Sequence, residues 1–256
     1  MDRLAQIDTT KYIPAETALI ILGDAGINFY LNKTDEKLKT KIQATGFTIF
    51  CLRGNHEERP ENLGMEPHMI LDKSYQGIFY FEDKYPNILY FNNFGLYKLG
   101  RYIIYVIGGA YSVDKYYRLA NAPVGAKWTG WFEDEQLNEE EMLACQEEIY
   151  NLPHNLTIDF VFTHTCPIQW EPIELFLNMI DQSTVDKTME LWLEEIEKDL
   201  QPYKHWLFGH YHADRYERPN VLQMYENIEN LNDIYNRTDE EKMWFRKSPY
   251  YHEGQN

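Results

Sequence analysis

The sequence has 256 residues, of which 44% are hydrophobic and 15% aromatic, and this length and composition suit a single domain with a substantial core. The formal net charge of −17 disfavours tight binding to duplex DNA or RNA, because an acidic surface repels the phosphate backbone. No run of 18 apolar residues is present, so we expect no membrane span.

Residues 18–24 form the first predicted strand, an apolar run that ends in Gly-Asp. Residues 34–45 have the spacing of a helix with Thr34 as its cap, and residues 47–52 form the next strand. A strand, a helix and a strand in this order predict two parallel, adjacent strands. Residues 58–77 hold two prolines and two glycines and are expected to be a long loop.

The next segments predict an antiparallel meander followed by alternating helices and strands. The meander strands are residues 78–81, 88–91, 95–99 and 102–107. A loop rich in Tyr and Trp follows at 110–132, and then the expected elements are a helix at 134–150, a strand at 158–163, a helix at 184–200, and strands at 205–208 and 220–224. We interpret the acidic run at 133–141 as a solvated helix face. From about residue 226 we expect a polar extension of the single domain 1–256.

Polar side chains with metal-binding chemistry follow four of the predicted strands. They are Asp24, Asn55, His164, and the pair His210 and His212. A carboxylate, an amide oxygen and imidazoles suit manganese, iron, zinc, cobalt or nickel, and argue against calcium or magnesium as the only ions. Each motif alone is common and has a bland interpretation as a cap or a core residue. Their joint occurrence at strand ends predicts a site for two divalent ions.

The motifs Gly-Asp, Gly-Asn-His-Glu, a strand-end His and Gly-His-x-His together resemble the calcineurin-like metallophosphoesterase superfamily. The resemblance runs from about residue 18 to residue 215. Residues 108–114 (Gly-Gly-Ala-Tyr-Ser-Val-Asp) resemble a small bacterial and phage-type branch of it. The resemblance implies a four-layer α/β/β/α sandwich of two mixed sheets, with the metals at strand ends between the sheets.

The resemblance also implies a role for each of these residues. Asp24 would bridge two metals, of which manganese is the first expectation; Asn55, His164 and His210 would bind one ion, and His212 the other. His56 would be the catalytic histidine, assisting a metal-bound hydroxide in the hydrolysis of a phosphate mono- or diester. The expected substrate is a phosphorylated small molecule or a nucleotide.

One family motif has no counterpart in this sequence. The family carries an Asp-x-His motif on a strand before its Gly-Asp, whereas here the only earlier aspartates are Asp2 and Asp8, and neither has a histidine two places on. The first core strand and two metal ligands would then be missing. The sequence leaves three explanations open: a longer parent chain, an enzyme that binds one metal, or a catalytically impaired protein that binds a nucleotide or a protein partner.

Three basic residues are candidates for binding a substrate phosphate: Arg53, Lys115 and Arg118. The alternative is that they form salt bridges on the surface. The arginine that protein serine/threonine phosphatases carry after Gly-Asp is absent, which favours a generic phosphoesterase. The three cysteines have no paired spacing, and the N-terminus lacks the pattern of a secretory signal. We therefore expect a cytoplasmic protein. The oligomeric state is left open.

Overall fold

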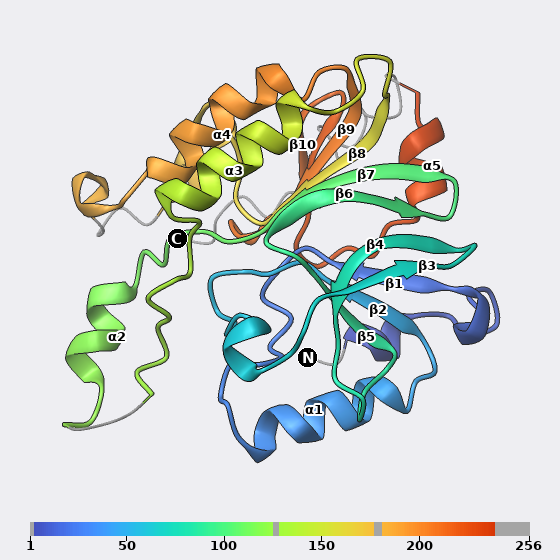
Figure 1. Cartoon of the computed structure of the whole chain (residues 1–256). Helices are drawn as coiled ribbons and strands as arrows, with labels where there is room; N and C mark the ends of the chain where they lie inside the picture. Colours follow the sequence, from blue (N-terminus) through green and yellow to red (C-terminus); the bar gives the residue numbers. More distant parts are fainter. Residues whose placement is uncertain (1–2, 125–127, 177–180, 239–256) are drawn as a thin grey trace.

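The computed structural model describes residues 3–124, 128–176 and 181–238. Within them, eleven strands form one continuous mixed sheet in the order β1-β2-β5-β4-β6-β7-β8-β9-β11-β10, with β3 paired to β4 (Figure 1). The strands are β1 (Ala18–Ile21), β2 (Thr48–Cys51), β3 (His68–Leu71), β4 (Tyr75–Tyr80), β5 (Ile88–Phe91), β6 (Phe94–Leu99), β7 (Tyr102–Ile107), β8 (Ile158–Thr163), β9 (Tyr203–Phe208), β10 (Arg215–Arg218) and β11 (Val221–Gln223).

Helices lie on both sides of this sheet in Figure 1. Helix α1 lies below the half that contains β1, β2 and β5, and α3 and α4 lie above the half that contains β7, β8 and β9. The helices are α1 (Lys33–Gln43), α2 (Lys115–Asn121), α3 (Glu139–Tyr150), α4 (Thr188–Asp199) and α5 (Leu231–Asn236). Short 3₁₀ segments occur in the connections, for example at Pro14–Glu16 and Glu61–Leu63. No described helix is both long and apolar enough to cross a membrane.

Each central strand supplies side chains to two hydrophobic cores, because successive residues of a strand point to opposite faces. In β8, Val161 packs into a core with α3 and α4, while Phe160 and Phe162 face a second core. In β2, Phe50 joins that second core, and Ile49 joins a third core with α1. The second core therefore lies on the face of these strands opposite to the face that packs against α1, α3 and α4.

The predicted strand pairing is right at the start of the chain and partly wrong in the middle. β1 and β2 are parallel neighbours, as expected. The predicted meander is interrupted, since β5 pairs with β4 but also runs parallel to β2, and β6 is bonded to β4 instead of β5. The expected loop at 58–77 contains the strand β3, whose residues are mostly exposed at the edge of the sheet.

The ends of three helices also differ from expectation. Asn32, not Thr34, caps α1, because its side chain accepts a hydrogen bond from the Thr34 backbone N–H at 2.8 Å. The helix predicted from residue 134 begins at Glu139, where Asn138 and Glu141 form a reciprocal capping box. The helix predicted at 184–200 begins at Thr188, and its apolar residues Met189, Trp192, Leu193 and Ile196 are all buried in the core with α3.

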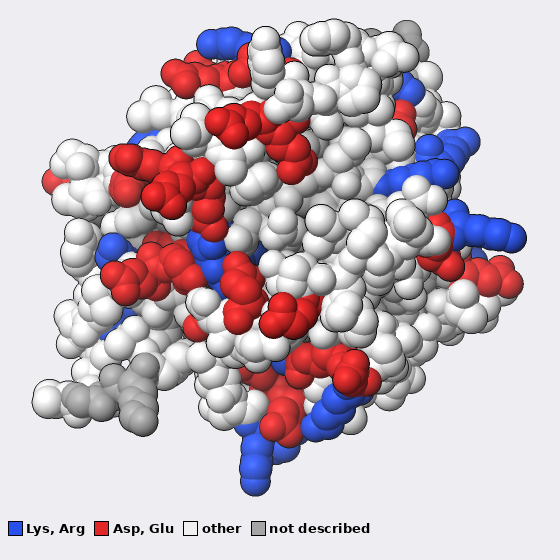
Figure 2. Space-filling view, in the orientation of Figure 1, with Lys and Arg blue, Asp and Glu red and all other residues white. Residues whose placement is uncertain are grey.

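The C-terminal segment after residue 226 is not entirely an exposed extension. Ile234 of α5 is fully buried in the second core. The ring of Tyr235 packs against Tyr102, with the centroids 5.2 Å apart. Residues 239–256 of the expected extension lie outside the described residues. Acidic side chains are spread over the face in Figure 2, in keeping with the net charge of −17.

Candidate metal centre

Four of the predicted ligands come together where β1, β2, β8 and β9 end. Asn55 lies at the centre of the group. Its side-chain oxygen is 3.0 Å from His164 Nε2 and 3.2 Å from His210 Nδ1. Asp24 Oδ2 lies 3.4 Å from His164 Nε2. The four side chains are thus linked by close contacts, although they follow four different strands.

The atoms that converge here are mostly hydrogen-bond acceptors. His164 Nδ1 lies 2.7 Å from the carbonyl oxygen of Leu22, which can only accept, so Nδ1 carries a hydrogen, and in the neutral ring Nε2 carries none. His164 Nε2 then presents a lone pair to the oxygens of Asn55 and Asp24. Converging lone pairs repel one another unless a positive charge lies between them. This arrangement therefore fits a bound cation.

The spacing of the four side chains also fits a shared metal ion. Two atoms bound about 2.1 Å from one transition-metal ion are about 3.0 to 3.4 Å apart, depending on the angle between them. The measured separations of 3.0, 3.2 and 3.4 Å fall in this range. Within the described residues, no three His, Cys, Asp or Glu side chains form a metal cluster on their own. The contact between His164 and His210 runs through the amide oxygen of Asn55.

The charge states of Asp24 and His210 favour cation binding. Burial raises the pKa of Asp24, but His164 and His56 outweigh burial and hold that pKa below its ordinary value, so Asp24 is ionised. Burial lowers the pKa of His164, but Asp24 outweighs burial and raises it, so a metal ion would have to displace a proton from this ring. Burial and the neighbouring His164 lower the pKa of His210 to about 3. A neutral imidazole and an ionised carboxylate are the forms that bind metals.

The backbone around the site is unusual. Asp24, His210 and His212 all have a positive φ, at 53°, 65° and 56°. Residues other than glycine adopt this conformation at a cost of about 1–3 kcal/mol, and such positions cluster at functional sites. The backbone therefore holds three of the predicted ligands in conformations that cost stability.

Glu57 joins the two loops that carry Asp24 and Asn55. One of its carboxylate oxygens accepts a hydrogen bond from the backbone N–H of Ala25, and the other accepts one from Gly54 at 3.1 Å. Burial and Asp24 raise the pKa of Glu57 to about 8. The hydrogen bonds of Glu57 therefore go to the backbone beside two predicted ligands.

His56 and His212 lie at the edge of the four-residue group. His56 Nε2 lies 3.2 Å from Asn55 Nδ2 and 3.5 Å from the Arg118 guanidinium. The His212 ring stacks on Tyr225 with the ring centroids 4.7 Å apart. His212 is close enough to His210 to contribute to the lowering of its pKa.

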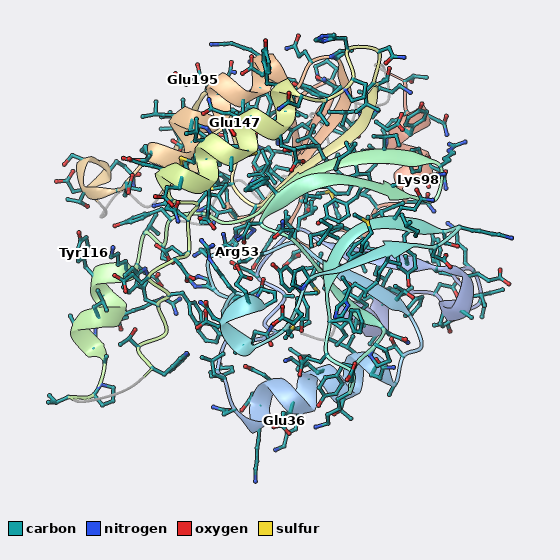
Figure 3. The ribbon with its side chains drawn as sticks, in the orientation of Figure 1. Glu36, Arg53, Lys98, Tyr116, Glu147 and Glu195 are labelled. Atoms are coloured by element: carbon teal, nitrogen blue, oxygen red, sulfur yellow. The ribbon has the colours of Figure 1, made fainter. Side chains whose placement is uncertain are left out.

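The three basic candidates occupy different environments. Arg118 of α2 reaches His56 and donates hydrogen bonds to Asp114 at 2.7 Å and to the Gly130 carbonyl at 2.9 Å. Lys115, also on α2, places its ammonium group over the Trp131 ring, 4.2 Å from the centroid. Helix α2 extends away from the body of the protein, with Tyr116 at its outer side in Figure 3.

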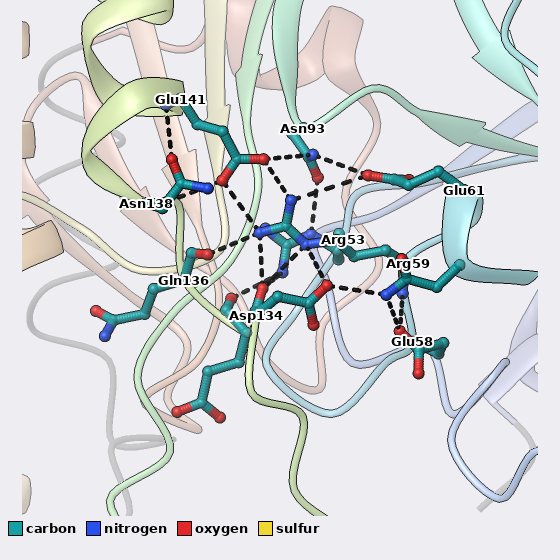
Figure 4. A network of polar contacts seen from close by, with 11 residues as sticks. Arg53, Glu58, Arg59, Glu61, Asn93, Asp134, Gln136, Asn138 and Glu141 are labelled. Atoms are coloured by element: carbon teal, nitrogen blue, oxygen red, sulfur yellow. Dashed lines mark hydrogen bonds and ion pairs between the residues drawn. The ribbon is translucent and has the colours of Figure 1, made fainter.

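Arg53 is buried, with 5% of its surface exposed, in a network of polar contacts (Figure 4). Its guanidinium group donates hydrogen bonds to Asn93 at 3.0 Å and to the Glu135 carbonyl at 2.7 Å. Arg59, which the sequence analysis did not single out, lies beside it and pairs with Asp134 and Glu141. Because Arg53 is occupied in the interior, we leave it out of the proposed substrate-binding residues.

A cavity of about 420 Å³ adjoins the aromatic residues next to His56. It is lined chiefly by the aromatic residues Trp128, Trp131 and Phe132 and the acidic residues Glu58, Glu133 and Asp134. Phe29 connects the cavity to the site, since its ring centroid is 5.1 Å from that of Trp128 and 6.0 Å from that of His56. The segment 110–132, which was predicted to be a loop, contains the helix α2, and its residues Trp128, Trp131 and Phe132 line this cavity.

The family model for calcineurin-like phosphoesterases matches residues 3–216, which is most of the chain. The chain belongs to this family. Metal-dependent hydrolysis of phosphate esters is the general activity that membership in the calcineurin-like phosphoesterase family implies, and its members generally bind divalent metals. A comparison with curated proteins gave no match.

Proposed function

We propose that this calcineurin-like phosphoesterase hydrolyses a phosphate mono- or diester at the cluster of Asp24, Asn55, His164 and His210. The observation that carries the proposal is the series of close contacts that links these four side chains: Asn55 Oδ1 lies 3.0 Å from His164 and 3.2 Å from His210, and His164 lies 3.4 Å from Asp24. They would hold one divalent ion, and their mixed nitrogen and oxygen donors suit manganese as the first choice, with iron, zinc, cobalt or nickel as alternatives.

His212 would contribute to a second ion that Asp24 shares. The positive φ of His212 supports a functional role for this residue. Bound divalent ions would neutralise charge on the phosphoryl group and lower the pKa of a water molecule. The residues present fit the first ion better than the second, because His212 contacts Tyr225 and lies outside the group centred on Asn55.

His56 would supply a proton to the leaving oxygen. Its Nε2 faces two donors, Asn55 Nδ2 and the Arg118 guanidinium, so Nε2 accepts and the ring hydrogen is on Nδ1. Nδ1 has no hydrogen-bond partner among the described residues. To act as an acid, His56 would first take up a proton at Nε2; the resulting imidazolium would give that proton to the leaving oxygen and return to the neutral ring.

The substrate in this proposal is a phosphorylated small molecule or a nucleotide. Arg118 would bind the phosphate, because its guanidinium group lies beside His56. The organic part would occupy the neighbouring cavity, whose three aromatic side chains suit a flat ring such as a base. The acidic lining disfavours further phosphate groups in that cavity.

We further propose a four-layer α/β/β/α sandwich as the arrangement that presents this site. Three separate hydrophobic cores support it, with one between α1 and its half of the sheet, one on the opposite face of the strands, and one beneath α3 and α4. Three buried free cysteines (Cys51, Cys145 and Cys166) agree with a reducing, cytoplasmic setting.

Hydrolysis of p-nitrophenyl phosphate and bis-p-nitrophenyl phosphate with added Mn²⁺ tests the proposal. We expect turnover of at least one ester that requires the metal and is lost in Asp24→Asn and in His210→Ala. Activity that survives both substitutions in a clean preparation would contradict the mechanism. Saturable nucleotide binding without any turnover would instead favour the catalytically impaired binding protein.

A further inference from the structure

A buried series of hydrogen bonds ends at Asn55, the central residue of the proposed metal site. The inference drawn from it rests on the proposed function. The series runs from Glu135, in the segment before α3, through Ser112, in the loop after β7. All three residues are almost fully buried, with exposed fractions of 3% for Glu135, 1% for Ser112 and 2% for Asn55. Water is therefore largely excluded from the series, and its members must satisfy one another.

Each hydrogen bond in this series has a fixed direction. The Ser112 backbone N–H donates to Glu135 Oε1 at 2.9 Å, and the Ser112 hydroxyl donates to Glu135 Oε2. Burial raises the pKa of Glu135, while the two hydrogen bonds from Ser112 lower it by stabilising the carboxylate. As a carboxylate, Glu135 takes the single hydrogen of the hydroxyl. Ser112 Oγ then has only lone pairs to present to Asn55. The group that faces it at 2.8 Å must be the donor, Asn55 Nδ2.

The orientation of this amide decides which atom faces the proposed metal. With Nδ2 held by Ser112, the Asn55 oxygen points at His164 Nε2 and His210 Nδ1. The two ends of an asparagine amide have nearly the same size, so shape alone does not prevent a flip. A flipped amide would present an NH₂ group, which carries no lone pair suited to a cation.

We propose that Ser112 and Glu135 are positioning residues that fix the Asn55 amide with its oxygen toward the metal. Glu135 can do this because it is itself held in place. Its backbone carbonyl accepts hydrogen bonds from the Arg53 guanidinium at 2.7 Å and from the Ala110 N–H at 3.2 Å. These bonds hold the backbone of Glu135, and its carboxylate then sets the donor and acceptor roles in the series of hydrogen bonds that ends at Asn55.

The substitution Glu135→Gln tests the direction of the series without changing its shape. The glutamine oxygen would accept from the Ser112 N–H, and its NH₂ group would donate to Ser112 Oγ. The hydroxyl hydrogen would then turn to Asn55 and favour the flipped amide. We expect Mn²⁺ affinity, measured by calorimetry, to fall about 10- to 100-fold. Ser112→Ala should have a similar effect, and Glu139→Gln, an exposed position in the first turn of α3, is the matched control.

A second substitution at position 55 separates positioning from general damage to the site. An aspartate there would accept the turned hydroxyl hydrogen with one oxygen and present the other oxygen to the imidazoles. Asn55→Asp should therefore raise Mn²⁺ affinity more in the Glu135→Gln background than in the wild type. Equal gains in the two backgrounds would overturn the proposed direction of the series.

The side-chain amide signals of Asn55 in ¹⁵N NMR provide a readout without metal, and Asn55→Asp identifies them by their disappearance. We expect slow hydrogen exchange of these signals in the wild type and fast exchange in Ser112→Ala. Unchanged amide signals and unchanged Mn²⁺ affinity in both Ser112→Ala and Glu135→Gln would overturn the inference. If the wild type binds no Mn²⁺, the proposed function fails, while the amide signals still decide whether Ser112 orients Asn55.

Discussion

The Cα atom of Gly54 lies directly against the carboxylate of Asp24. A Cβ atom added at Gly54 would overlap both the side-chain oxygen and the backbone nitrogen of Asp24. The φ of Gly54 is not positive, so lack of space, and not backbone strain, excludes a larger residue here. The loops after β1 and β2 can therefore bring Asp24 and Asn55 together only if position 54 is glycine.

Gly54→Ala should separate the two loops and weaken Mn²⁺ binding about tenfold or more, because the crowded neighbour includes backbone that cannot rotate away. Calorimetric titration of the folded variant measures this effect. Gly64→Ala is the matched control. Gly64 has a φ of 77° and nothing within 4 Å of an added Cβ, so its replacement should cost only about 1–2 kcal/mol of stability. Equal metal affinities of the two variants would contradict the close approach.

Arg118→Ala should lower kcat/KM for an anionic ester about 10- to 100-fold, the equivalent of one lost charge-assisted hydrogen bond. The reason is that its guanidinium group lies 3.5 Å from His56 Nε2. Steady-state kinetics at several substrate concentrations measures the change. Lys115→Ala, on the same helix, should have a smaller effect because the Lys115 ammonium group is over the Trp131 ring. A larger loss in Lys115→Ala than in Arg118→Ala would reverse our assignment.

Glu190 of α4 should make the stability of the protein depend on pH. Burial raises the pKa of Glu190 to about 7, although the hydrogen bond from Thr165 lowers it; Glu171 raises it further and Lys187 lowers it. The neighbouring Cys166 and Tyr211 complete the ionisable groups around it. The folded-state pKa lies above the unfolded value of 4.5, so the folded state binds this proton more tightly than the unfolded state does. The proton therefore contributes to the free energy of unfolding at low pH, and this contribution is lost as the pH rises from about 4.5 to about 7.

The change should amount to about 2–3 kcal/mol across this pH range, since one pKa unit corresponds to about 1.4 kcal/mol. Urea unfolding of the wild type and of Glu190→Gln at pH 5 and pH 8 measures it. The wild type should lose stability relative to Glu190→Gln as the pH increases. Glu195→Gln, an exposed position on the same helix, is the matched control. A difference between wild type and Glu190→Gln that is the same at both pH values would refute the prediction.

The strands that carry the site could be predicted from the sequence because they are buried and strongly apolar. Strand β8 (Ile158–Thr163) has the predicted bounds, and β2 and β9 differ from theirs by one or two residues. Strands β3 and β10 were missed because both are only four residues long and lie toward the edges of the sheet, where β3 is mostly exposed and β10 is largely polar. The position of β5 beside β2 depends on contacts between distant segments, which a local pattern does not contain.

The residues around the proposed ligands were harder to predict than the ligands. Ser112 lies in a motif that the sequence analysis noted, but its contact with Asn55 spans 57 positions. Glu135 lies within the acidic run at 133–141, which we interpreted as a solvated helix face. That interpretation is wrong for part of the run, since Glu135 is buried and Glu141 pairs with Arg59. Composition does not distinguish a buried carboxylate from its exposed neighbours.

Anomalous diffraction from crystals soaked in Mn²⁺ would test the proposed metal site most directly. The account predicts a manganese peak within about 2.0–2.4 Å of ligand atoms from Asp24, Asn55, His164 and His210. For Asn55, the nearest atom should be the side-chain oxygen. Well-occupied manganese elsewhere with none at this position, or these four side chains pointing away from one another, would contradict the account.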